Sequence, residues 1–212
     1  VFGKRNESLS LTLYSASIFG THSKKFQRKN MHMTLTKDLL RKMPKCELHC
    51  HLDGSMRVET VRELAHQQGV TLPTEDPAEL HRMLVQDEAA TLVNYLKAFD
   101  ITLSVLQEAD ALYRAAYELI EDAAQENIIY IEVRYSPILH QRKGLKLTQI
   151  VESVLAGLRQ GERDFKVRWG LIICGMRSSH PKYTRQMAEL CIAYKNQGVV
   201  GFDLAGAEGG NP

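Results

Sequence analysis

Two hydrophobic patterns alternate along the chain from residue 46 to residue 205. Short β-branched or alternating runs predict strands, and the stretches between them carry apolar residues at helical spacing. The predicted strands cover residues 46–53, 128–135, 167–174 and 199–205. The predicted helices cover residues 56–68, 77–85, 109–125, 148–161 and 183–196, with one more that carries Leu92, Tyr95, Leu96 and Phe99 at i, i+3, i+4 and i+7.

This order of elements predicts an α/β fold. Strands and helices alternate four times, which favours a parallel sheet with helices outside it. The pattern leaves open whether the sheet is doubly wound or belongs to a closed barrel. Residues 208–212 have the composition of a loop after a buried strand, so we expect a chain that is cut rather than finished.

The first 33 residues have a different composition. They are rich in Ser and Thr, and their charges are Lys4, Arg5, Lys24, Lys25, Arg28 and Lys29 against the single acid Glu7. This composition is typical of a transit-type segment, or of a translated leader before a true start at Met31 or Met33, which we favour. We therefore expect residues 1–33 to lie outside the domain and residues 34–212 to form it.

Composition excludes several classes of protein. The contents of 44% hydrophobic and 25% charged residues are ordinary for a soluble globular chain. A net charge of +2 and the lack of any apolar run near 18 residues indicate neither a nucleic-acid nor a membrane partner. The four cysteines form no C-x-x-C pair, so reduced thiols in a cytoplasmic protein are expected.

The segment of greatest chemical interest is Glu-Leu-His-Cys-His-Leu-Asp-Gly, residues 47–54. Strand alternation places His49, His51 and Asp53 on one face and the intervening residues on the other. Two imidazoles at i and i+2 lie about 7 Å apart at their backbones and can converge on one metal ion. The alternative is a pair of histidines that only pack or hydrogen-bond within the sheet.

Several motifs, in order, extend this observation. Residues 43–55 resemble the opening of adenosine deaminases, within the amidohydrolase superfamily, and the similarity continues at residues 95–100, 130–137, 174–177 and 201–208. The resemblance covers about residues 42–212. It implies a TIM-type (β/α)8 barrel of which only about the first half, four βα units, is present.

The resemblance also implies roles for individual residues. His49 and His51 would be ligands of one Zn²⁺, and His51 would also contact the nucleoside. Asp53 would hydrogen-bond the ribose 5′-hydroxyl, and the backbone amide of Gly206 would approach purine N3. Apolar side chains of the helix near residue 95 would form a lid, although any core-facing helix shows the same spacing.

The implied reaction is hydrolytic deamination of adenosine, and of 2′-deoxyadenosine, to inosine and ammonia. In the family, the remaining zinc ligands and the general acid Glu lie further along the chain, so no catalytic residue is expected within residues 1–212. We therefore expect this chain to be inactive and poorly stable by itself.

Two positions bear on specificity. Asp53 favours a nucleoside, because family members that act on free adenine usually have Glu there. Ala207 departs from the Asp that often follows the glycine, which leaves the substrate hydrogen bonds open. The alternatives are an adenine deaminase or other amidohydrolase, and a truncated paralogue without catalysis. The H-x-E and P-C-x-x-C motifs of the other zinc deaminases are absent.

Overall fold

The computed structural model describes residues 35–85 and 92–208, with only the backbone described for residues 92–97. The chain divides into two units, Val1–Met43 and Pro44–Pro212. In the first unit, the described residues form the short helix α1 (Lys37–Lys42), and the Thr36 side chain accepts a hydrogen bond from the Leu39 N–H (3.1 Å) as its N-cap. The expected leader, residues 1–33, lies outside the described residues.

The second unit is built on a parallel sheet. Its strands are β1 (Lys45–His51), β2 (Ile128–Tyr135), β3 (Arg168–Met176) and β4 (Val199–Ala205). They pair in sequence order, β1-β2-β3-β4, and every pairing is parallel. Each strand therefore returns through a helical crossover, and all four carboxyl ends lie at the same end of the sheet.

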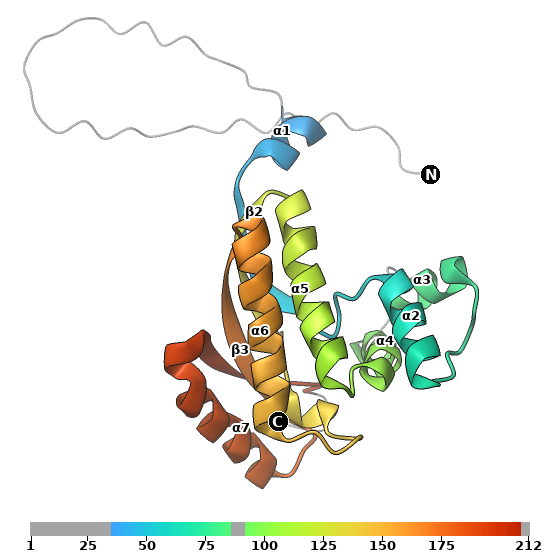
Figure 1. Ribbon diagram of the computed structural model, residues 1–212, viewed down its shortest axis with the longest axis vertical. Coiled ribbons are helices and arrows are strands. Elements are labelled where there is room, and N and C mark those ends of the chain that lie inside the picture. Colours follow the sequence, from blue (N-terminus) through green and yellow to red (C-terminus); the bar gives the residue numbers. More distant parts are fainter. Residues whose placement is uncertain (1–34, 86–91, 209–212) are drawn as a thin grey trace, which may run out of the picture. The chain divides into compact units, whose positions relative to one another are not determined.

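Helices fill the three connections (Figure 1). Between β1 and β2 lie α2 (Val58–Gln68), α3 (Pro77–Val85), α4 (Leu92–Val105) and α5 (Ala109–Gln125). Between β2 and β3 lie η1 (Pro137–His140) and α6 (Leu147–Phe165), and between β3 and β4 lie α7 (Pro181–Tyr194) and η2 (Lys195–Gln197). No helix among the described residues is long and apolar enough to cross a membrane.

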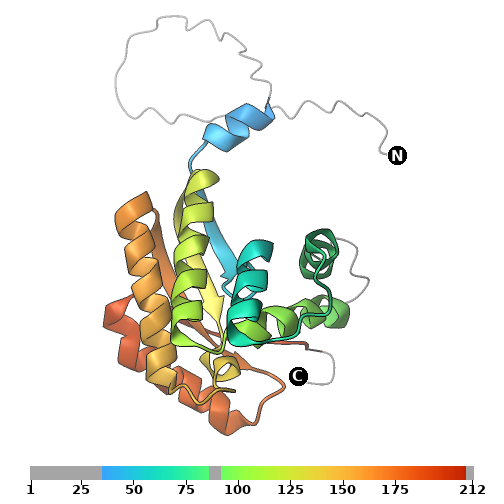
Figure 2. The same ribbon diagram turned by 45° about the vertical axis from the view of Figure 1, so that its right-hand side comes forward.

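Much of the core lies between the sheet and the helices α5, α6 and α7. Helices α5 and α6 run side by side in both views (Figures 1 and 2). Two glycines of α6 allow this close approach. A Cβ at Gly157 would lie 2.3 Å from the backbone oxygen of Tyr113, and one at Gly161 would lie 2.6 Å from Ile120 Cβ. Larger residues at either position would push the two helices apart.

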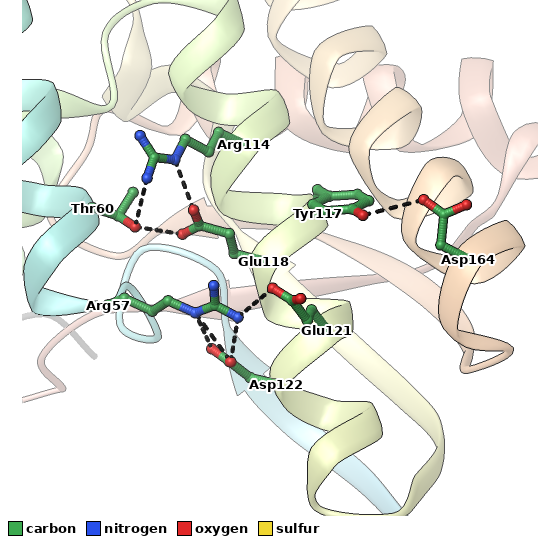
Figure 3. A network of polar contacts seen from close by, with 8 residues as sticks. All are labelled: Arg57, Thr60, Arg114, Tyr117, Glu118, Glu121, Asp122 and Asp164. Carbon is green, nitrogen blue, oxygen red and sulfur yellow. Dashed lines mark hydrogen bonds and ion pairs between the residues drawn. The ribbon is translucent and has the colours of Figure 1, made fainter.

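A polar network holds α2 against α5 (Figure 3). The guanidinium of Arg57 contacts Glu121 and Asp122, each at 2.6 Å, and Thr60 donates to Glu118 at 2.6 Å. Because α2 begins shortly after β1, these contacts fix the helix that follows the β1 carboxyl end.

The predicted elements are confirmed, with bounds that differ by a few residues. Helix α1 and the two 3₁₀ turns were not predicted. The strand predicted over residues 46–53 ends at His51, and its pairing with β2 is irregular between Glu47 and Cys50. Strict alternation is therefore wrong here: Leu48 is 56% exposed and Leu52 is 1% exposed, although both were assigned to one face.

Candidate functional site

The two histidines of the H-x-H motif lie together at the carboxyl end of β1. Their ring centroids are 5.4 Å apart, and the ring of Phe99 from α4 meets His51 edge-on at 5.8 Å. The bulge between Glu47 and Cys50 sets two β1 residues opposite one residue of β2, which alters the direction of the side chains that follow. The structure thus brings the predicted pair into contact.

The surroundings favour the neutral form of His51. Burial lowers the pKa of His51, and the neighbouring His49 and Arg134 lower it further, whereas Asp203 acts in the opposite direction. A neutral imidazole has the free lone pair that a metal ion requires. Within residues 35–85 and 92–208, no group of three or more His, Cys, Asp or Glu side chains is arranged to hold a metal. His49 and His51 thus offer two imidazole nitrogens to a metal ion.

Asp53 lies in the turn after β1 and is buried, with 4% of its surface exposed. Its Oδ1 atom has no hydrogen-bond partner in the described structure, which is costly for a buried carboxyl. It lines a cavity of about 20 Å³, together with Gly54, Met56, Leu84, Ala98, Phe99 and Thr102. That volume holds about one water molecule. A buried carboxyl oxygen without a partner, on a residue that lines a small cavity, is a position where a polar ligand atom can bind.

Burial also raises the pKa of the Asp53 carboxyl to about 7, against the backbone groups of Asp53 and Gly54, which lower it. Gly54 brings Phe99 close to this turn, because a Cβ at Gly54 would lie 3.0 Å from the Phe99 ring. Phe99 therefore contacts His51 and borders the Asp53 cavity at the same time.

Gly206 follows β4, at the same end of the sheet as the histidines. Its φ of +106° lies in a region that L side chains rarely adopt, so glycine is required here for its conformation. The segment around it is tied to the end of β3: the Arg177 N–H donates to the Ala205 carbonyl at 2.8 Å, and Arg177 pairs with Glu208 at 3.2 Å.

The predicted lid is only partly described. The side chains of Leu92, Tyr95 and Leu96 lie outside the described part of the structure, and Phe99 is the member whose contacts are known. Its contact with His51 agrees with a position over the site, and its role in a lid stays a prediction.

Sequence reasoning missed Arg134. This residue of β2 is 8% exposed, and its guanidinium pairs with Asp203 of β4 at 2.6 Å and donates to the Leu48 carbonyl at 3.1 Å. The available signal was an arginine inside a run of apolar strand residues, because a buried charge requires partners. Which partners it finds depends on strands far apart in the sequence.

The adenosine deaminase family model matches residues 44–212. An adenosine deaminase of Enterococcus faecalis is 44% identical over 169 residues, which is 80% of this chain and 50% of that protein. The chain spans half or less of the length of the curated relatives it matches.

Solved structures share the fold. An adenine deaminase from Arthrobacter aurescens superimposes with a TM-score of 0.71 at 28% identity, covering 80% of this chain and 50% of that one. An amidohydrolase from Burkholderia ambifaria, determined with bound Zn, gives a TM-score of 0.72 at 23% identity, covering 86% and 50%. The second likeness concerns the fold alone.

The parallel βα units define this class of protein: about half of the TIM barrel found in amidohydrolases. Within that class, the chain belongs to the adenosine deaminase family. The prediction of half a barrel is thereby confirmed. The sequence pattern left open whether the sheet is doubly wound or part of a barrel, and the sheet belongs to a barrel.

Proposed function

We propose that the protein containing this chain is a zinc-dependent adenosine deaminase, which hydrolyses adenosine and 2′-deoxyadenosine to inosine and ammonia. The observation that carries the proposal is the contacting His49–His51 pair at the carboxyl end of β1, in a chain whose family model is that of adenosine deaminases. Barrel enzymes build their sites at this end of the strands.

In this proposal His51 has two tasks, as a zinc ligand and as a contact to the nucleoside, and each of the other residues has one. His49 and His51 would be two of the ligands of a zinc ion, which when bound would supply Lewis-acid activation of a water molecule. The unpartnered Oδ1 of Asp53 binds the ribose 5′-hydroxyl, because that hydroxyl satisfies a buried oxygen that otherwise has no partner. The Gly206 amide approaches the purine, and Phe99 keeps water away from His51.

These tasks are binding and orientation. The resemblance to the family assigns the general acid, a Glu, to a segment that follows Gly206 in those proteins. Residues 1–212 would thus supply two metal ligands and substrate contacts, and no proton donor for the purine ring.

The test is a substrate comparison with the full-length protein. We expect zinc-loaded protein to convert adenosine and 2′-deoxyadenosine, with one ammonia released for each inosine, and to act poorly on adenine and AMP. Removal of zinc with a chelator should abolish the activity, and added zinc should restore it. His49→Ala and His51→Ala should each lose zinc and activity together.

Faster conversion of adenine than of adenosine would favour the alternative function, an adenine deaminase, which the structural likeness at 28% identity suggests. Binding of adenosine by zinc-loaded protein without any turnover would instead indicate a paralogue without catalysis. Either result would overturn the proposal.

A further inference from the structure

Arg134 is a buried charge beside the candidate zinc ligands. In the pairing of β1 with β2, Arg134 stands directly opposite His51. Its side chain is 10% exposed, so its N–H groups depend on acceptors within the protein. Nη1 and Nη2 have such acceptors, whereas Nε has none among the described residues. The acceptors that it finds lie on both edge strands of the described sheet.

Two hydrogen bonds of Arg134 are made to residues on either side of the histidine pair. The backbone carbonyl of Arg134 accepts from the Leu52 N–H at 3.0 Å, and its Nη2 donates to the Leu48 carbonyl at 3.1 Å. Residues 49–51 thus lie between two hydrogen bonds made by one residue of β2. The second bond falls in the bulge, where two β1 residues face one residue of β2 and regular pairing is interrupted.

The other contact reaches across β3 to β4. The Nη1 atom of Arg134 lies 2.6 Å from Oδ2 of Asp203, and Oδ1 of that carboxylate accepts from the Leu204 N–H at 2.8 Å. Asp203 is three positions before Gly206, so one planar guanidinium joins the segment that carries the histidines to the strand that leads to Gly206.

From these contacts we infer that Arg134 is a positioning residue, which holds His49 and His51 in the geometry that binds zinc and fixes their distance from the Gly206 segment. The inference rests on the proposed function. Arginine is required because its rigid fork presents two N–H donors at once, whereas lysine has a single ammonium that cannot make both contacts in the same directions.

The decisive comparison is between two Arg→Lys substitutions in the full-length protein. Arg134→Lys keeps the charge and loses the fork. Arg57→Lys does the same at an arginine that also contacts two acceptor groups, Glu121 and Asp122, between α2 and α5 (Figure 3). The second variant is therefore a control for the general cost of losing a paired guanidinium.

We expect Arg134→Lys to raise the zinc Kd of the metal-free protein at least tenfold, measured by competition with a chromophoric chelator. Arg57→Lys should leave this Kd within twofold of wild type, even if its unfolding midpoint falls as far as that of Arg134→Lys. A zinc Kd of Arg134→Lys within twofold of wild type would overturn the inference, as would an equal loss in both variants.

A second variant covers the case in which Arg134→Lys does not fold. Asp203→Ala removes the partner on β4, whose side chain is 40% exposed, and should raise the zinc Kd at least threefold. Asp203→Asn retains an acceptor for Nη1 and should recover most of the affinity. Unchanged zinc binding in Asp203→Ala would contradict the inference.

A readout without metal separates this inference from the proposed function. Hydrogen–deuterium exchange of a peptide spanning residues 48–52 should be faster in metal-free Arg134→Lys than in wild type, and unchanged in Arg57→Lys. Equal exchange in all three proteins would overturn the positioning role. Zinc-loaded wild type that leaves adenosine unconverted would overturn the proposed function alone.

Discussion

The imidazole of His140, in the turn after β2, is fully buried and should make the protein less stable in mild acid. Its Nδ1 donates to the Leu106 carbonyl at 2.8 Å, its Nε2 has no partner among the described residues, and its ring lies against Tyr135 at 5.7 Å. Burial lowers the pKa of His140 from 6.5 to about 4, with a smaller lowering by Arg142, although the hydrogen bond to Leu106 raises it.

The sign follows from proton binding. Between the folded pKa of about 4 and the unfolded pKa of 6.5, the unfolded state binds the proton and the folded state does not. Stability from the neutral His140 is therefore complete above pH 6.5 and is lost as the pH falls toward 4. With these two pKa values, the loss is about 2 kcal/mol at pH 5 and about 3 kcal/mol at pH 4.

The assay compares wild type with His140→Gln, which retains a side-chain N–H donor and does not titrate. Urea unfolding of both proteins at pH 7, 6, 5 and 4 gives the difference in unfolding free energy at each pH, in which the contributions of all other titrating groups cancel. We expect this difference to decrease by about 2 kcal/mol between pH 7 and pH 5. A difference independent of pH, or a His140 imidazole that titrates near pH 6.5 by NMR in the folded protein, would refute the reasoning.

Three further predictions concern packing, the loop after β4 and the isolated chain. Gly157→Ala should destabilise the protein by about 1–3 kcal/mol in urea unfolding, because its Cβ would overlap the Tyr113 carbonyl. Gln160→Ala, at a half-buried position of α6 where only hydrogen bonds along the helix are lost, should cost less. Gly206→Ala should raise the KM for adenosine at least fivefold, because a positive φ costs an L residue about 1–2 kcal/mol. The KM of the control variant Gly201→Ala, in β4, should stay near that of wild type. Residues 1–212 expressed alone should aggregate, because both described edge strands expose apolar side chains. They should also form no inosine, because the family assigns the remaining zinc ligands elsewhere. A monodisperse, active preparation would contradict this prediction.

Local pattern was sufficient for the elements of the fold. The β-branched run of residues 128–135 and the apolar periodicity of residues 109–125 identified β2 and α5 with their observed bounds. Gly69 marked the end of α2, where it adopts a left-handed conformation with φ of +65°. These features depend on neighbours within a few residues, so one sequence contains all the information they need.

The local sequence pattern predicted the candidate site only in part. The H-x-H motif indicated a metal site because two imidazoles on one short strand segment can reach one ion, and their contact at 5.4 Å agrees with that reasoning. The bulge at Leu48 and the early end of β1 were missed, since both depend on how β1 pairs with β2, about 80 residues later. Asp53 consequently lies in a turn and not on the strand.

The sequence by itself determined the alternation of strands and helices, the family, and the identity of the residues that carry the candidate chemistry. The tertiary structure alone decided that Arg134 joins Leu48 to Asp203, that His140 is buried without a second hydrogen-bond partner, and that Phe99 contacts His51 beside the Asp53 cavity. The physical reason is the separation along the chain over which each kind of interaction acts. Periodicity and turn preferences act between residues close in the chain, whereas burial and charge pairing depend on packing between segments that only the folded chain brings together.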